Sequence, residues 1–174
     1  MKLGIFSILL LASIGLTAQS KWSDRFYFGG GFGLSAGGNG TNISLSPQVG
    51  YKVTPRYSAG VGITYQYVKI KGIDSSINNY GWSVFNRYNI TRQFFAYSEF
   101  ENLQFEYFTS LSPERTARTG YNSLLVGAGY SESLAGRASF SISALYNVLY
   151  DPADPIQPYD SPWVIRAGVG IGIF

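Results

Sequence analysis

The chain has 174 residues, with 13 Lys and Arg against 10 Asp and Glu, so its formal net charge is only +3 at pH 7. It contains no Cys and no His, which removes disulfides, thiolate and imidazole chemistry and the commonest metal ligands. The charges are scattered and form no basic stripe, so nucleic-acid binding has no support. The composition predicts a protein that is not an enzyme and has no cofactor and no metal site.

The balance of aromatic and charged residues predicts a lipid environment. Aromatic residues make up 17% of the chain and charged residues only 13%, and there are 21 glycines. Soluble domains contain about 25% charged residues, so a chain this poor in charge is expected to be poorly soluble unless lipid solvates one of its faces. The mean hydropathy is near zero, as in β-barrels whose strands are apolar on one face only.

Residues 1–18 have the features of a secretory signal peptide. Lys2 gives a basic start, a mostly apolar run follows over residues 3–12, and the segment ends at Ala18. The apolar run is too short to cross a bilayer as a helix. We therefore expect cleavage after Ala18 and a single mature domain over residues 19–174.

Beyond residue 18, hydrophobicity alternates with a period of two, which is the pattern of β-strands with two different faces. In one such segment, Val61 and Ile63 alternate with Gly60, Gly62 and Thr64. Helical periodicity does not occur in this part of the sequence. In chain order, the predicted strands cover about residues 25–35, 41–52, 57–69, 79–89, 94–107, 123–130, 138–148 and 163–173.

The two faces of these segments differ in chemistry. One face is largely apolar, with Tyr or Trp near the strand ends, and the other is mostly small or polar. A soluble barrel or sandwich would instead turn its polar face outward. Small and polar side chains suit the interior of a narrow barrel, and an apolar wall with aromatic ends suits contact with lipid. The sequence therefore predicts an all-β fold, an eight-stranded antiparallel up-and-down transmembrane β-barrel.

The predicted connections alternate in length, as in outer-membrane barrels with short periplasmic turns and longer external loops. Short turns are expected at residues 53–56, 90–93 and 132–136, long polar loops at 70–77, 109–120 and 151–162, and a tight external turn at 36–40. This arrangement predicts a cell outer membrane location with both termini in the periplasm. A count of ten strands stays open, because residues 102–110 could fold back on themselves.

Two stretches resemble a known family. They are Ser46-Pro47-Gln48-Val49-Gly50-Tyr51-Lys52-Val53-Thr54, continued by Gly60-Val61-Gly62 and Tyr65, and Phe85-Asn86-Arg87-Tyr88, continued by Phe94-Phe95-Ala96-Tyr97 and Glu99. Together they resemble the outer-membrane β-barrel domain proteins of Bacteroidetes, which are similar in shape to the small OmpX and OmpA-like barrels. The resemblance covers about a third of the mature chain. It implies a Gram-negative outer-membrane barrel and no particular activity.

The sequence ends in Phe174, which resembles the terminal aromatic signal by which the barrel assembly machinery recognises its clients. In that signal the preceding apolar positions share the parity of the final aromatic. Here Val169, Ile171 and Ile173 have the opposite parity. A β-bulge near the end of the strand would restore the phase.

Charged residues of inward parity are the candidate site. Arg87, Glu99, Glu101 and Arg166 all have this parity, and a charge inside a narrow barrel needs a partner. Arg87 and Glu99 flank a short turn, so they are expected at similar depth on neighbouring strands. We expect a structural ion-pair network that plugs the barrel. The alternative is a catalytic or conducting site, but enzymes on small outer-membrane barrels resemble one another in relying on a histidine, which this chain lacks.

The predicted function is that of a non-enzymatic integral outer-membrane barrel. It would act as a structural or accessory subunit of an outer-membrane assembly, or through its external loops in adhesion or defence. The alternative is a narrow channel for small solutes or ions. The expected partners are outer-membrane lipid, the barrel assembly machinery during insertion and an outer-membrane protein complex.

Overall fold

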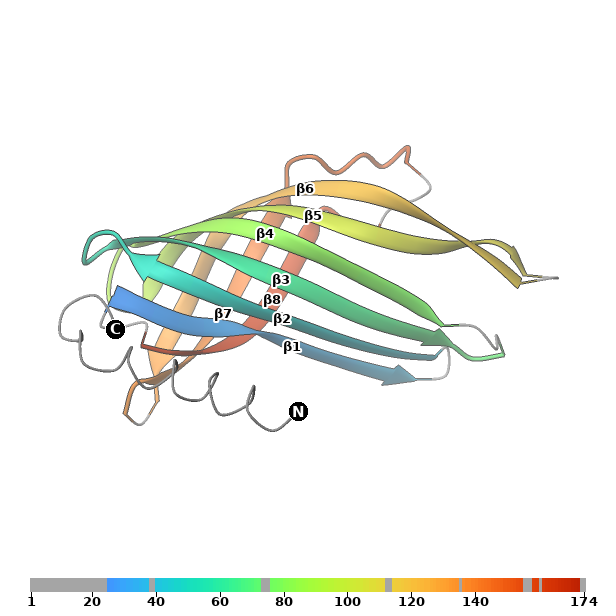
Figure 1. Cartoon of the computed structure of the whole chain (residues 1–174). Coiled ribbons are helices and arrows are strands. Elements are labelled where there is room, and N and C mark those ends of the chain that lie inside the picture. Colours follow the sequence, from blue (N-terminus) through green and yellow to red (C-terminus); the bar gives the residue numbers. More distant parts are fainter. Residues whose placement is uncertain are drawn as a thin grey trace, which may run out of the picture.

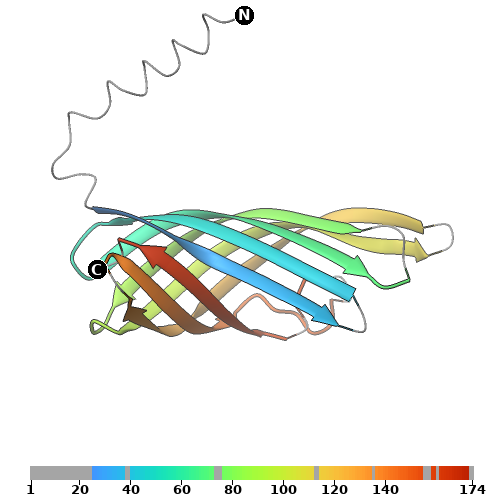
Figure 2. The ribbon, with the colours of Figure 1, turned by 90° about the horizontal axis from the view of Figure 1, so that it is seen from below.

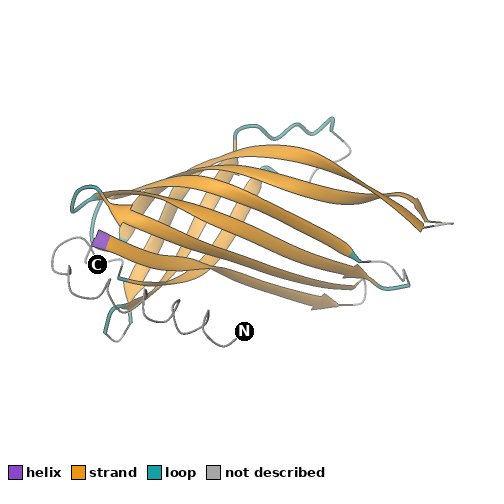
Figure 3. Ribbon diagram, viewed as in Figure 1, coloured by secondary structure: helices purple, strands orange, loops and turns teal. Residues whose placement is uncertain are grey.

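A computed structural model of the chain describes residues 25–37, 40–72, 76–111, 114–134, 136–154, 158–159 and 161–172. Strands make up most of these residues and close into one barrel, in which each strand pairs with its neighbours in sequence and β1 pairs with β8 (Figures 1 and 3). The strands are β1 (Phe26–Gly37), β2 (Gly40–Lys52), β3 (Tyr57–Ile70), β4 (Ile77–Asn89), β5 (Phe94–Leu111), β6 (Glu114–Ser133), β7 (Ala138–Asn147) and β8 (Trp163–Ile171).

All of the strand pairs are antiparallel. The prediction of an all-β, eight-stranded antiparallel barrel is therefore confirmed. Within the described ranges, no helix is long and apolar enough to cross a membrane. The predicted signal peptide and Phe174 lie outside the described residues.

The alternation of the sequence sets the two faces of the wall. On β3, the outward-facing Val61 and Ile63 are 58% and 63% exposed, whereas the inward-facing Ser58 is 6% exposed. Large hydrophobic side chains are exposed in the same way on all of the other strands. The interior contains small and polar residues and several large buried side chains, of which Phe85, Leu125 and Leu145 are the most completely buried.

Two of the predicted short turns form where a threonine can cap them. In the turn between β2 and β3, the hydroxyl of Thr54 accepts the amide of Tyr57 at 2.9 Å. Thr91 accepts the amide of Phe94 in the same way between β4 and β5, also at 2.9 Å. A hydroxyl that bonds to nearby amides stabilises a tight turn. Both turns lie at the end of the barrel where β1 begins (Figure 1).

The prediction of a long loop over residues 109–120 is wrong. Apart from residues 112–113, which are not described, these residues belong to β5 and β6, and the ladder continues to Leu111↔Glu114 with one register shift near Phe108. This part of the hairpin extends beyond the neighbouring strands (Figures 1 and 2). Because no other described strand completes a wall beside Glu114–Gly120, the sequence there need not alternate between apolar and small residues, although the pairing persists. The ten-strand alternative is also wrong, because residues 102–110 continue β5.

The closure between β1 and β8 is short. Phe28–Gly31 pair with Gly168–Ile171, and in the described chain the ladder ends there. A Cβ on Gly31 would lie 3.2 Å from the carbonyl oxygen of Ala167, and one on Gly168 would lie 3.0 Å from that of Gly30. Glycines on both strands therefore permit this close backbone approach.

Candidate functional site: a polar network across the lumen

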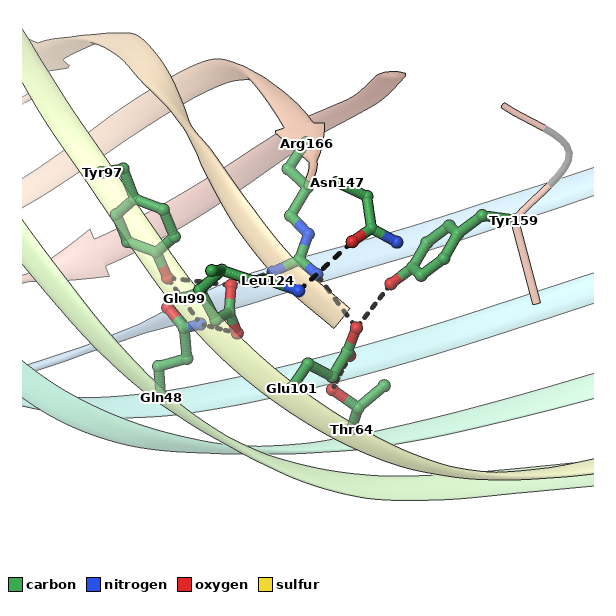
Figure 4. A network of polar contacts seen from close by, with 9 residues as sticks. All are labelled: Gln48, Thr64, Tyr97, Glu99, Glu101, Leu124, Asn147, Tyr159 and Arg166. Carbon is green, nitrogen blue, oxygen red and sulfur yellow. Dashed lines mark hydrogen bonds and ion pairs between the residues drawn. The ribbon is translucent and has the colours of Figure 1, made fainter. Parts of the chain in front are cut away.

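The lumen is crossed by an ion-pair network that joins β5 to β8 (Figure 4). Glu99 and Glu101 are alternate residues of β5, so both point inward, and each is 2% exposed. Arg166 points inward from β8. Its guanidinium forms an ion pair with Glu99 through Nη1, and Nη2 lies 3.6 Å from Oε2 of Glu101. Since β5 and β8 are not neighbours in the sheet, these contacts span the interior.

Glu99 is held by two further side chains. The amide of Gln48 on β2 donates to its Oε1 at 3.4 Å, and the hydroxyl of Tyr97 donates to its Oε2 at 3.2 Å. Gln48 also donates to the Tyr97 hydroxyl at 3.1 Å. Strands β2, β5 and β8 therefore meet at one carboxylate.

Glu101 has a second set of donors. The Thr64 hydroxyl on β3 donates to Oε1 at 3.4 Å, and the hydroxyl of Tyr159 donates to Oε2 at 2.5 Å. Tyr159 belongs to the connection between β7 and β8, so this connection reaches into the network (Figure 4). Tyr159 was not predicted from the sequence, because a residue in an irregular connection has no periodicity to indicate where it points.

Asn147, the last residue of β7, lies beside the network and is 1% exposed. Its Oδ1 accepts the amide of Leu124 at 3.2 Å and that of Leu149 at 3.1 Å. These bonds lie where the β6–β7 ladder ends, at Leu125↔Asn147. The connection from β7 to β8, which contains Tyr159, begins directly after Asn147.

The charges explain why so many donors converge. Burying a carboxylate is costly unless it is paired and hydrogen-bonded. Here the two buried carboxylates share a single arginine, and each of their oxygens also accepts a hydrogen bond from an amide or hydroxyl. In the part of the chain that is described, no cluster of acidic side chains could hold a metal ion. The arrangement is suited to tying strands together.

Arg87 does not join this network. The register pairs Arg87 with Tyr97, while Glu99 pairs with Phe85, so the two expected partners are offset along the strands. Arg87 instead lies over the ring of Phe95, with 3.7 Å from Cζ to the ring centroid, and donates from Nε to Asn89 at 3.0 Å. The structure thus corrects the predicted four-residue network to Glu99, Glu101 and Arg166.

A cavity of about 290 Å³ lies in the lumen beside the network. Small side chains line much of its wall, and Arg87 and Arg166 both border it. The small residues of the alternating pattern therefore leave space that the network does not fill. The residues from β2 and β7 that line it are Ser44, Ser46, Gln48, Ser141 and Ser143.

A second feature is the outer part of the β5–β6 hairpin. The β6–β7 ladder ends at Leu125↔Asn147, so Glu114–Gly120 of β6 extend beyond β7. On the other side, the β4–β5 ladder ends at Tyr80↔Gln104. Within the described residues, the β6 segment Glu114–Gly120 has no neighbouring strand on the side away from β5.

Glu106 docks this hairpin onto β4. Its carboxylate accepts the amide of Asn78 at 3.0 Å and the hydroxyl of Thr116 at 2.9 Å, and it lies 3.2 Å from Nη2 of Arg118. The Arg118 guanidinium also lies over the Tyr80 ring, 4.5 Å from its centroid. The hydrogen bond from Asn78, followed by that from Thr116 and the charge of Arg118, lowers the pKa of Glu106 below its ordinary value of 4.5, although partial burial opposes the shift.

No protein-family model matches the chain, and no curated protein matches it significantly. The geometry of these features is therefore the basis for the function proposed below.

Proposed function

We propose that this chain is a non-enzymatic integral outer-membrane barrel that binds a partner protein through the extended β5–β6 hairpin. The observation behind this proposal is the strand edge of Glu114–Gly120, which projects beyond the barrel without a neighbouring strand among the described residues. Such an edge is a template for strand addition by another chain.

The outward faces of the strands support the membrane location. Large hydrophobic side chains that are between about a third and two thirds exposed occur on all eight strands, among them Phe32, Ile63, Trp82 and Ile165. Soluble proteins rarely expose contiguous apolar surface of this kind, and barrels that cross a bilayer need it. Residues 1–18 would direct export, and the barrel assembly machinery would insert the mature chain.

The orientation follows from the turns. The short turns at residues 53–56 and 90–93 lie at one end of the barrel, and the β5–β6 hairpin projects from the other (Figure 1). Short turns face the periplasm in barrels of this kind. The hairpin would then stand outside the cell, where it could take part in adhesion or defence or join a neighbouring protein of the outer membrane as an accessory subunit.

A narrow channel is the second candidate, because the lumen contains a cavity of about 290 Å³. Against it, Arg166 ties Glu99 and Glu101 across the interior and Tyr159 reaches in from the β7–β8 connection. Conductance in planar bilayers separates the two candidates. The plugged barrel is expected to give no steady conductance, whereas a conductance of nanosiemens scale would favour the channel.

The hairpin proposal is tested with a shortened variant. Replacing residues 108–116 by Asn-Gly preserves the pairing of Tyr107 with Ala117 and supplies a two-residue hairpin turn. A photoreactive amino acid at Thr119 reports on the partner in whole cells. We expect a crosslinked partner from the full-length hairpin and none from the shortened one, at equal amounts of protein in the outer-membrane fraction.

The matched control is Lys71→Gln in the exposed turn that follows β3. This variant is expected to retain the crosslink at Thr119. If the shortened hairpin also retained partner binding and cell adhesion in full, the hairpin would not be the binding element. If the protein were absent from the outer-membrane fraction, the membrane location itself would be wrong.

A further inference from the structure

The seam between β1 and β8 is open over half of its length. Pairing stops at Gly31↔Gly168, but β1 continues to Gly37 beside β2, and β8 already starts at Trp163 beside β7. In Figure 1, β8 turns away from β1 beyond the paired stretch. Among the described residues, Phe32–Gly37 and Val164–Ala167 therefore face each other without a shared ladder. This gap is at the end of the barrel from which the β5–β6 hairpin projects.

An unpaired strand edge has a physical consequence in a membrane. Backbone amides and carbonyls that face lipid without a partner are energetically costly, so such edges are tolerated only where they line a polar cavity. The lumen cavity meets this condition. It is bordered by Gly29, Gly30 and Gly31 of β1 and by Arg166 and Gly168 of β8.

The same cavity also reaches the outer face of the wall. Its lining includes Phe32, Ile165, Ala167 and Val169, which have outward parity and flank the open seam. The cavity is thus bordered by apolar side chains where it meets the seam. Toward the interior it is bordered by serines, Gln48 and charged groups.

Arg87 provides the cationic group on the inner side. It is 8% exposed, borders the cavity, and makes no ion pair with any described residue. Its one hydrogen bond runs from Nε to Asn89, so the two Nη groups have no described partner. A buried guanidinium of this kind is suited to a carboxylate or phosphate, which it can bind in a bidentate manner.

We propose that the lumen cavity binds a single-chain amphiphile with an anionic headgroup, such as a fatty acid, which enters through the open β1–β8 seam. The headgroup binds Arg87, and the acyl chain leaves between Phe32 and Ala167 toward the lipid. The volume of about 290 Å³ is at the lower end of the range of small-molecule sites, roughly 300–1,000 Å³, and favours one chain over two. The inference rests on the proposed membrane location and is independent of the hairpin.

The test uses the full-length barrel in phosphatidylcholine nanodiscs and dodecanoate with a terminal diazirine. After illumination, labelled peptides are mapped by mass spectrometry. We expect labelling concentrated at Phe32, Ile165 and Ala167 and much weaker at Ile63 and Trp82 on another part of the wall. Unlabelled dodecanoate should compete, and dodecyltrimethylammonium should not.

Two variants test the two parts of the site. Arg87→Gln should weaken dodecanoate binding about tenfold or more, as expected for the loss of a charge-assisted hydrogen bond, whereas Arg92→Gln in the exposed β4–β5 turn should not change it. Ser143→Phe fills the cavity and should abolish seam labelling. Its control, Ala144→Phe, points outward on the same strand and should leave the labelling intact.

Several outcomes would overturn the proposal. Labelling spread evenly around the wall would mean ordinary lipid contact, and equal competition by the cationic amphiphile or unchanged binding by Arg87→Gln would remove the anionic site. A second protein strand crosslinked at the seam would assign the edges to protein pairing instead. Flotation of the protein with vesicles in a density gradient is measured first, so that a failed membrane location is distinguished from a failed binding site.

Discussion

The contact between the first and last strands, β1 and β8, is built very differently from the contact between the two middle strands, β5 and β6. The β5–β6 ladder runs from Phe94↔Tyr130 to Leu111↔Glu114, past the neighbouring strands on both sides. The β1–β8 ladder is confined to Phe28–Gly31 and Gly168–Ile171. The β5–β6 hairpin therefore extends far beyond the other strands, whereas the barrel is closed between β1 and β8 by a short ladder. Among the described residues, the first seam leaves part of β6 unpaired on the side away from β5, and the second leaves parts of β1 and β8 without a shared ladder.

The chemistry of the two seams differs as well. Side chains hold the β5–β6 seam, including the Phe94–Tyr130 ring pair, with centroids 5.4 Å apart, and the Glu106–Arg118 ion pair. The β1–β8 seam depends on glycine backbones that approach closely. Arg166 connects the two regions, because it extends from β8 to Glu99 on β5. The short seam is thus supported from across the lumen.

Removal of Arg166 should have the largest effect. Arg166→Met leaves two buried carboxylates without a cationic partner, and breaking a buried ion pair costs about 3–5 kcal/mol. We expect a loss of about 3 kcal/mol in the free energy of unfolding, at the lower end because the arginine side chain is 28% exposed. Urea unfolding in vesicles, followed by tryptophan fluorescence, measures the loss. Amide exchange should rise more at Gly168–Ile171 than in the β5–β6 ladder.

The control separates charge from packing. Glu99→Gln and Glu101→Gln combined with Arg166→Met remove every charge of the network, so most of the stability should return. If Arg166→Met alone lost less than about 1 kcal/mol, the value of an exposed surface pair, the network would not support the seam. Equal amide exchange in both ladders would also contradict the assigned connection.

Alanine in place of a glycine of β1 that packs closely on β2 should have a smaller effect. A Cβ on Gly30 would lie 2.4 Å from the carbonyl oxygen of Ser46 and 2.8 Å from Cα of Pro47, and Gly30 has a φ of +152°. Gly30→Ala should cost about 2 kcal/mol, within the range of roughly 1–3 kcal/mol for backbone strain, and should lower the urea midpoint.

Gly120→Ala is the matched control on the β5–β6 hairpin. The added Cβ would meet only the flexible end of Gln104, at 3.3 Å from Nε2. It should be neutral, or stabilising by about 0.4–1 kcal/mol through the unfolded state. Similar losses for both substitutions would mean that the close approach of Gly30 to the backbone of β2 does not limit the packing of β1.

The sequence predicted the wall of the barrel because alternation is a local property. Val61 and Ile63 against Ser58 and Gly62 already show which face is outward, and the short turns at residues 53–56 and 90–93 follow from their local sequence. The inward parity of Glu99, Glu101 and Arg166 was equally readable. Their contact was expected only in general terms, since parity does not fix which side chains meet across a lumen.

What the sequence did not reveal depends on register and on contacts between distant segments. Arg87 was placed beside Glu99, but the observed register opposes it to Tyr97. Tyr159 has no periodic context, and its contact with Glu101 depends on how the β7–β8 connection folds. The outer hairpin was not predicted because residues 109–120 do not alternate between apolar and polar residues, and this alternation is the signal that predicts a strand. The early end of the β1–β8 ladder likewise has no local sequence signal.

The hairpin should respond to acid, and this is the smallest expected effect, since partly exposed ion pairs contribute about 0.2–1 kcal/mol. The pKa of Glu106 in the folded protein is lowered below 4.5, chiefly by the hydrogen bond from the Asn78 amide. The Glu106 carboxylate therefore stabilises the hairpin fully above pH 4.5, and this contribution is lost as the pH falls through the lowered pKa of the folded protein. NMR signals of the backbone amides of Phe105–Leu111 should broaden below that pH, while those of the turn at residues 90–93 stay sharp. Glu106→Gln retains an acceptor for Asn78 but cannot titrate, so its hairpin signals should not change with pH. The same acid transition in this variant would assign the effect to another group, and the Glu106 carboxylate would then not be what holds the hairpin to β4.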